Sequence, residues 1–90
     1  MATILAFHEV DDVEHWLRSP KRQEIFGPLG ITGRLFTDPA QTSRVGLVVE
    51  IPDMEAFQRL MQSDEAAEAM RSDGVRPETL VLLEEASEHL

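Results

Sequence analysis

Two histidines, four carboxylates and the chain's only tryptophan lie within thirteen residues, HEVDDVEHWLRSP, from 8 to 20. Imidazole and carboxylate groups at this density could transfer protons, because histidine titrates near neutral pH. The carboxylates at 11, 12 and 14 also suit the first turn of a helix, where each is favoured by about 0.3–1 kcal/mol. His8 is therefore the main candidate for chemistry, as a general base or as a donor to an oxyanion. The structural alternative is a histidine satisfied by a neighbouring carboxylate or backbone group.

A second candidate set lies on two adjacent predicted strands. If Val48 faces the interior of a barrel, Glu50 faces it too, and Arg34 has the matching parity on the neighbouring strand. Arg34 and Glu50 either form a structural ion pair across the sheet or take part in catalysis. In the catalytic alternative, Arg34 stabilises an enolate or carboxylate of a ligand, Glu50 orients a partner and His8 moves the proton.

Aromatic and aliphatic side chains would line the substrate pocket beside these groups. Phe36 and Val48 share the parity of Arg34, and Trp16 follows His8 at the start of a helix. Trp16 also fits a helical core stripe, so packing is the alternative to a stacking role. No metal site is expected, because His8 and His15 are separated by a strand-to-helix turn, no HxxxH or HxH pattern occurs and the chain has no cysteine. No cofactor is expected either.

Alternating and helical patterns give a β-α-β-β-α-β order. The predicted strands are residues 3–10, 31–38, 44–51 and 78–86. Asp11 is the expected cap of the first helix, which Ser19 and Pro20 interrupt before a second short helix. Asp53 and then Ser63 are expected to cap the helices of the second half, and Gly74 to end them. Residues 1–90 form one domain, of class α+β, with a ferredoxin-like four-stranded antiparallel sheet that carries both helical segments on one face.

Apolar residues occur on both faces of the predicted sheet. In the third strand Val45, Leu47 and Val49 point one way, whereas Gly46 and Val48 point the other. The first strand likewise divides into Leu5 and Phe7 against Ile4, Ala6 and His8, and we assign the second group to the barrel interior. A sheet with one solvated face would alternate apolar and polar residues. A second copy of the chain is the economical cover for the other face, which predicts a homodimer whose sheets pack face to face.

The chain resembles the dimeric α/β-barrel proteins. The resemblance rests on the element order, on VVEIPDMEAFQRLMQSDEAAEAM with its strand, aspartate cap and broken helix, and on DGVRPETLVLLEE before the last strand. This superfamily includes small cofactor-independent monooxygenases, polyketide cyclases, haem-degrading enzymes and stress-associated proteins. The resemblance implies a cleft in each subunit, with catalytic residues that differ between subfamilies. The haem-binding members use a histidine from the region of the second helix, which this chain lacks.

Composition excludes several classes of function. The net charge is −9, and residues 50–90 carry eleven acidic and three basic groups. Such a surface repels phosphate backbones and anionic lipids, so neither nucleic acid nor a membrane is an expected partner. No apolar run reaches the ~20 residues of a membrane span, and no secretory signal is evident. The expected location is the cytoplasm.

Two functions remain open from the sequence. The first is a small cofactor-independent enzyme, of monooxygenase, cyclase or isomerase type, that acts on an apolar aromatic or polyketide-like molecule in a barrel cleft. The monooxygenase part follows from the resemblance alone. The second is a non-catalytic dimer, either one that binds a small apolar ligand or a stress-associated protein without turnover.

Overall fold

The computed structural model describes all 90 residues. The strands are β1 (Ala2–Val10), β2 (Thr32–Thr37), β3 (Arg44–Ile51) and β4 (Val75–Glu84). The helices are α1 (Val13–Arg18), α2 (Lys21–Phe26), the 3-10 helix η1 (Gly27–Leu29), α3 (Met54–Met61) and α4 (Asp64–Ser72). Each helical segment is thus split into two short helices, at the Ser19–Pro20 interruption and at Ser63, as the sequence predicted. No helix is long and apolar enough to cross a membrane.

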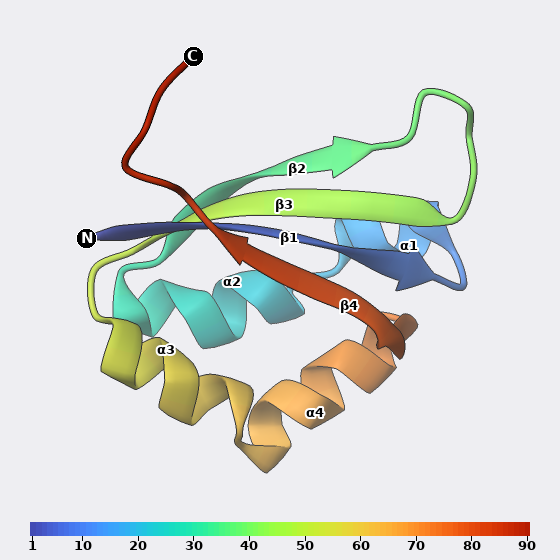
Figure 1. The fold of residues 1–90 in the computed structure, drawn as a ribbon. Helices are drawn as coiled ribbons and strands as arrows, with labels where there is room; N and C mark the ends of the chain where they lie inside the picture. The colour runs from blue at the N-terminus through green and yellow to red at the C-terminus, as the bar shows by residue number, and fades with distance from the viewer.

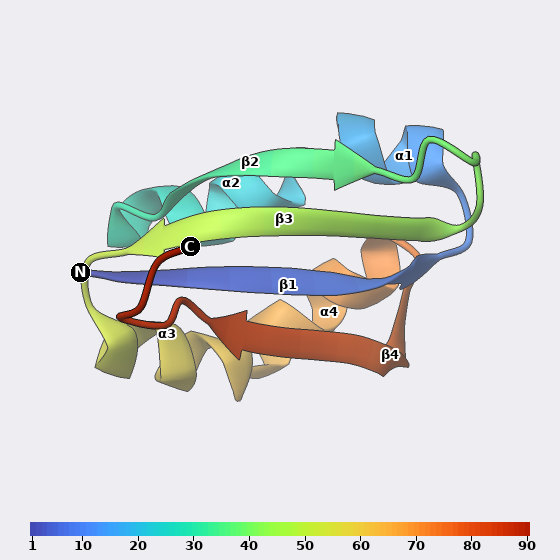
Figure 2. The same ribbon diagram turned by 45° about the horizontal axis from the view of Figure 1, so that its top comes forward.

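The four strands form one antiparallel sheet in the order β2-β3-β1-β4. All helices lie on one side of this sheet, and the opposite side carries no layer (Figures 1 and 2). Two β-α-β units around the β2–β3 hairpin give a ferredoxin-like arrangement, which confirms the predicted fold class.

Side-chain caps fix where three of the helices begin. Asp53 accepts a hydrogen bond from the amide of Ala56, and Ser63 caps α4 in the same way. At α1 the cap is Asp12, whose side chain accepts from the His15 amide, so the prediction of Asp11 was wrong by one residue. The Asp11 carboxylate instead accepts a hydrogen bond from Arg76.

The core lies between the sheet and the helices. Val10, Trp16 and Ile51 are at most 1% exposed, and residues at alternate positions of β1 and β3 pack around them. These positions are Ile4, Ala6, His8 and Val10 on β1 and Val45, Leu47, Val49 and Ile51 on β3. The helix-facing side of the sheet is therefore defined by the even residues of β1 and the odd residues of β3.

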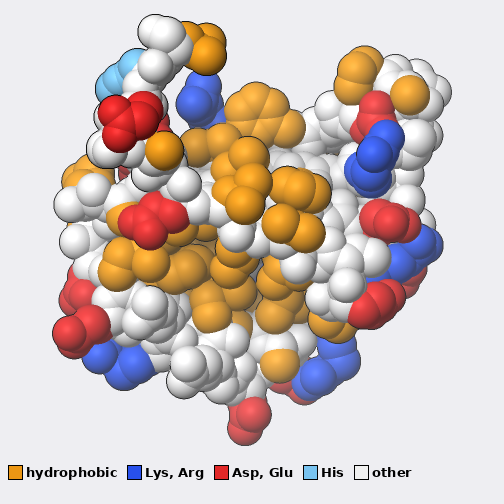
Figure 3. Space-filling view, viewed as in Figure 1, with side chains coloured by type: hydrophobic (Ala, Val, Ile, Leu, Met, Phe, Trp, Pro, Cys, Tyr) orange, Lys and Arg blue, Asp and Glu red, His pale blue; other side chains and the backbone are white.

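The opposite side of the sheet, which we call the open face, is also apolar. Its exposed hydrophobic residues are Leu5, Phe7, Phe36, Val81 and Leu83, with exposed fractions from 39% to 51%. Hydrophobic side chains gather over the sheet in the space-filling view (Figure 3). The predicted two-faced sheet is confirmed. The assignment of Ile4, Ala6 and His8 to the barrel interior was wrong, because the helices cover that side.

Candidate active site

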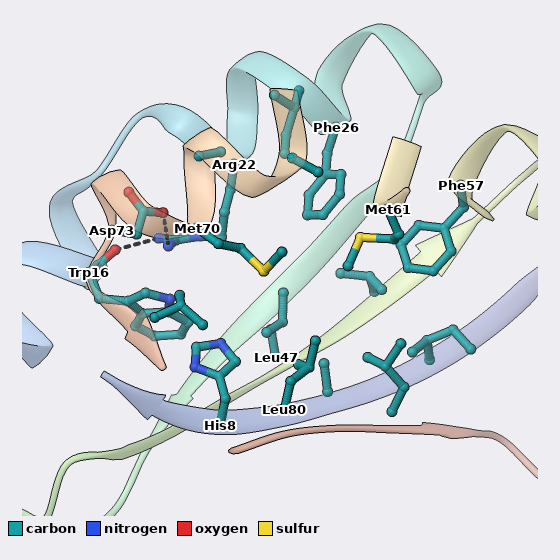
Figure 4. Close-up of a pocket in the computed structure, with 18 residues that line it drawn as sticks. His8, Trp16, Arg22, Phe26, Leu47, Phe57, Met61, Met70, Asp73 and Leu80 are labelled. Atoms are coloured by element: carbon teal, nitrogen blue, oxygen red, sulfur yellow. Dashed lines mark hydrogen bonds and ion pairs between the residues drawn. The ribbon is translucent and has the colours of Figure 1, made fainter. Parts of the chain in front are cut away.

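A cavity of about 80 Å³ lies between the sheet and the helices. Its floor comes from β1, β3 and β4 and its roof from α1, α2, α3 and α4, and 15 of its 18 lining residues are hydrophobic (Figure 4). The polar exceptions are His8, Arg22 and Asp73. An apolar chamber with a few convergent polar groups is the usual form of a small-molecule site.

His8 projects from β1 into this cavity and is 6% exposed (Figure 4). Its Nδ1 lies 3.4 Å from the carbonyl oxygen of Glu9, a contact that requires a proton on Nδ1. Nε2 has no hydrogen-bond partner in the protein. Burial lowers the pKa of His8 below its ordinary value of 6.5; the carbonyl contact opposes this shift and the charge of Arg22 adds to it. At neutral pH, His8 is therefore an uncharged imidazole whose free Nε2 can accept a proton or a hydrogen bond.

Trp16 holds the imidazole from the helix side. The two rings meet edge to face with their centroids 5.7 Å apart, and Trp16 is 1% exposed. The Arg22 guanidinium lies 4.5 Å from the centroid of the same indole and donates a hydrogen bond of 2.7 Å to the Trp16 carbonyl. Trp16 thus lines the cavity and is also a core residue.

A buried polar network joins three elements beside His8. The Asp73 carboxylate, at the end of α4, accepts a hydrogen bond from the Ser19 hydroxyl and lies 3.4 Å from Nη1 of Arg22. The side chain of Asp73 is 5% exposed and that of Arg22 is 17% exposed. Burial lowers the pKa of Arg22, and the charge of Asp73 opposes that shift. The network fastens α2 to α4 and compensates a positive charge within the protein.

Sequence reasoning missed Arg22 and Asp73. Arg18, Lys21 and Arg22 form a basic cluster of the kind that is usually solvated helix surface, although a helix that starts after Pro20 places residues 22, 25 and 26 on one face. Ile25 and Phe26 on that face line the cavity. This pattern could have shown that Arg22 points inward. No local signal marks Asp73, whose partners are 51 and 54 residues away in the sequence.

The sheet separates the other predicted site residues from His8. Arg34 pairs with Val48 in the β2–β3 register, and Phe36 pairs with Gly46, which places these side chains on the open face. Glu50 is on the same face, where it accepts a hydrogen bond of 2.7 Å from the Thr3 hydroxyl.

Arg34 and Glu50 do not form the ion pair that was one of the two alternatives for them. The guanidinium of Arg34 has no carboxylate partner and lies 5.8 Å from the ring centroid of Phe36. Arg34, Glu50, Phe36 and Val48 therefore share one surface, as predicted, but they do not share the cavity of His8 and Trp16. No group of three or more histidine and acidic side chains lies close enough to hold a metal ion.

No family model and no curated protein sequence matches the chain. Several solved structures do match it. One described as an antibiotic biosynthesis monooxygenase has a TM-score of 0.64 at 12% identity, over 99% of this chain and 100% of that one. The chain has a ferredoxin-like fold. A protein from Pseudomonas aeruginosa matches with a TM-score of 0.61 at 10% identity, over 98% and 94% of the two chains. A dabb family protein with a ferredoxin-like fold, from Mesorhizobium loti, matches with a TM-score of 0.56 at 13% identity, over 99% and 100%. At such identities the likeness establishes the fold alone.

Proposed function

We propose that the protein is a small cofactor-independent enzyme that removes a proton from an apolar molecule in the cavity, with the Nε2 of His8 as the base. The observation that carries this proposal is a buried imidazole that lines an apolar chamber, with a hydrogen-bond contact at Nδ1 and none at Nε2. Monooxygenation, cyclisation and isomerisation of a carbon acid can share this first step, in which the C–H electron pair stays on the substrate as an enolate. A positioned base contributes about 10²–10⁴-fold to such a step.

Two features of the site support base chemistry. The contact with the Glu9 carbonyl selects the tautomer with a free Nε2. The apolar lining keeps the imidazole uncharged and strengthens its interactions with a bound molecule. The monooxygenase type of reaction is supported only by analogy with the structural neighbour described as an antibiotic biosynthesis monooxygenase.

The second part of the proposal is a homodimer formed through the open face. Five large hydrophobic residues are exposed there, and the chain supplies no element to cover them. A second copy presents the same apolar surface, so packing two sheets face to face covers both at once. In that dimer Arg34 and Glu50 belong to the interface. We therefore assign catalysis to His8, and not to the predicted trio of His8, Arg34 and Glu50.

The experiment is hydrogen–deuterium exchange at the methyl group of acetophenone, an apolar single-ring carbon acid, followed by proton NMR in D₂O. The wild-type protein should accelerate the loss of the methyl signal, and His8→Gln should remove most of that acceleration. His15→Gln is the matched control, because His15 is exposed and its Nε2 lies 2.7 Å from the Ser72 carbonyl, outside the cavity. Exchange no faster than with free imidazole at equal concentration would contradict the proposal.

The alternative is a non-catalytic dimer that binds a small apolar ligand. It is favoured by the lining, which is apolar except for His8, Arg22 and Asp73, and in which the last two side chains pair with each other. If acetophenone perturbs the His8 signals without exchanging its protons, this alternative holds.

A further inference from the structure

The cavity is too small for the ligands that its chemistry would suit. Its volume is about 80 Å³, whereas an apolar cavity of about 150 Å³ is known to accept benzene. If the proposed function is right, part of the wall must move when an aromatic molecule binds. The question is which residues can move without breaking the core.

Two methionines occupy the middle of the roof. Met61 ends α3 and Met70 lies on α4, and their thioether ends point toward each other above Leu47 and Leu80 (Figure 4). Both are partly exposed, unlike the buried Phe57 beside them. Their partial exposure brings the cavity lining to the surface. In the space-filling view, hydrophobic side chains line a recess between β4 and the α3–α4 pair (Figure 3).

The remaining roof residues near this point are poor candidates for movement. Ala66 and Ala69 have no side-chain rotamers and are buried, and Arg22 is fixed by Trp16 and Asp73. Methionine has three rotatable bonds and an unbranched, polarisable end, so it can change shape at little cost. Met61 and Met70 are therefore the large cavity-lining side chains best able to move.

The backbone that carries the two methionines is held in place. Ser63, between α3 and α4, accepts a hydrogen bond from the Ala66 amide and donates one to the Leu60 carbonyl at 2.5 Å. Both helices also begin at side-chain caps. Because these contacts fix the helix ends, adaptation of the roof falls to the side chains of Met61 and Met70.

We propose that Met61 and Met70 form an adjustable wall that sets the size of the ligand, admitting single-ring apolar molecules and excluding fused rings. This deepens the proposed function and rests on it, because a ligand site is required for a size limit to have meaning. The two residues determine specificity; they carry no group that could take part in proton transfer.

The first experiment uses the wild-type protein with ¹³C-labelled methionine methyl groups. The chain has four methionines, so the spectrum contains its own controls. Met1 is 91% exposed, and Met54 packs against the core without lining the cavity. Fluorobenzene should shift the Met61 and Met70 signals and leave those of Met1 and Met54 in place. Equal shifts at Met54, or shifts at neither cavity methionine, would overturn the proposal.

The second experiment measures affinity for a one-ring and a two-ring probe by ¹⁹F NMR. Wild-type protein should bind fluorobenzene at least tenfold more tightly than 1-fluoronaphthalene. Met61→Ala with Met70→Ala should reverse this preference, whereas Met54→Ala should keep it. Met61→Leu with Met70→Leu conserves volume and guards against loss of folding; its stiffer branched side chains should weaken fluorobenzene binding.

The outcomes separate this proposal from the function on which it rests. If the wild type binds fluorobenzene and the alanine variant shows no gain for 1-fluoronaphthalene, the adjustable wall is wrong and the ligand site stands. Tight binding of 1-fluoronaphthalene by the wild type would also show that the adjustable wall is wrong and that the ligand site exists. If no form of the protein binds either probe, the ligand site and the wall are both refuted.

Discussion

Replacing Asp73 with alanine should destabilise the protein by about 3 kcal/mol or more. Removing one partner of a buried ion pair typically costs about 3–5 kcal/mol, because the other charge is left without compensation. Here the stranded group is Arg22, whose side chain is 17% exposed, and Ser19 loses its acceptor as well. The long 3.4 Å contact and the residual exposure of Arg22 place the expected cost at the lower end of that range. A chain of this length has a total stability on the order of 5–13 kcal/mol, so the loss is large.

Urea unfolding followed by far-ultraviolet circular dichroism measures this change. The matched control is Glu55→Ala, which removes an exposed carboxylate 3.8 Å from Arg59 and should cost no more than about 0.5 kcal/mol. A double variant, Arg22→Met with Asp73→Leu, removes both charges and should be more stable than Asp73→Ala alone. A cost below about 1 kcal/mol for Asp73→Ala, or a double variant less stable than Asp73→Ala, would show that Arg22 does not depend on Asp73 for compensation of its charge.

Three further predictions concern the pH profile, the open face and a close backbone contact. Since burial lowers the pKa of His8 below 6.5, the unfolded chain binds more protons, and the free energy of unfolding should fall as the pH drops below about 6.5. His8→Gln should flatten this part of the profile in urea titrations at several pH values. Phe7→Glu should give a monomer in sedimentation. Phe7 is 41% exposed, and burial of that fraction of a residue area of about 200 Å² contributes about 2 kcal/mol per subunit to the dimer. Leu17→Glu, on α1, should leave the dimer intact; a dimer that survives Phe7→Glu contradicts the interface. Gly33→Ala should cost about 1–3 kcal/mol in thermal unfolding, because its Cβ would lie 2.6 Å from the Val48 carbonyl oxygen; an unchanged melting temperature contradicts this.

The sequence was sufficient for the parts of the fold that depend on local rules. Asp53 and Ser63 cap helices where their spacing predicted, because a side-chain oxygen two or three residues before a free amide is a local arrangement. The alternation of β1 and β3 predicted that both faces of the sheet are apolar. Helix α1 begins one residue later than predicted, because Asp11 and Asp12 are both possible caps. Asp12 is the cap in the structure, and the Asp11 carboxylate accepts a hydrogen bond from Arg76 on β4.

Local rules do not determine which residues of neighbouring strands share a face, and this is why the predicted site residues lie on two faces of the sheet. Alternation shows which residues of one strand share a face, but the face that they continue on a neighbouring strand depends on the register. His8 pairs with Val45 and shares the helix-covered face with it, whereas Val48 and Arg34 lie on the open face. If one face of the sheet were polar, its residues could be matched from strand to strand, but both faces are apolar here. The burial of Arg22 likewise depends on Asp73, which lies 51 residues further along the chain.

The central claim is that His8 presents a neutral, unprotonated Nε2 to a ligand in the cavity. Long-range ¹H–¹⁵N correlation NMR of the histidine side chains at pH 7, with and without phenol, tests it most directly. We expect a proton on Nδ1 and none on Nε2 in the free protein, and a change in the Nε2 chemical shift when the phenol hydroxyl binds there. A protonated Nε2, or an Nε2 signal that phenol leaves unchanged while it perturbs His15, would show that His8 is not the base.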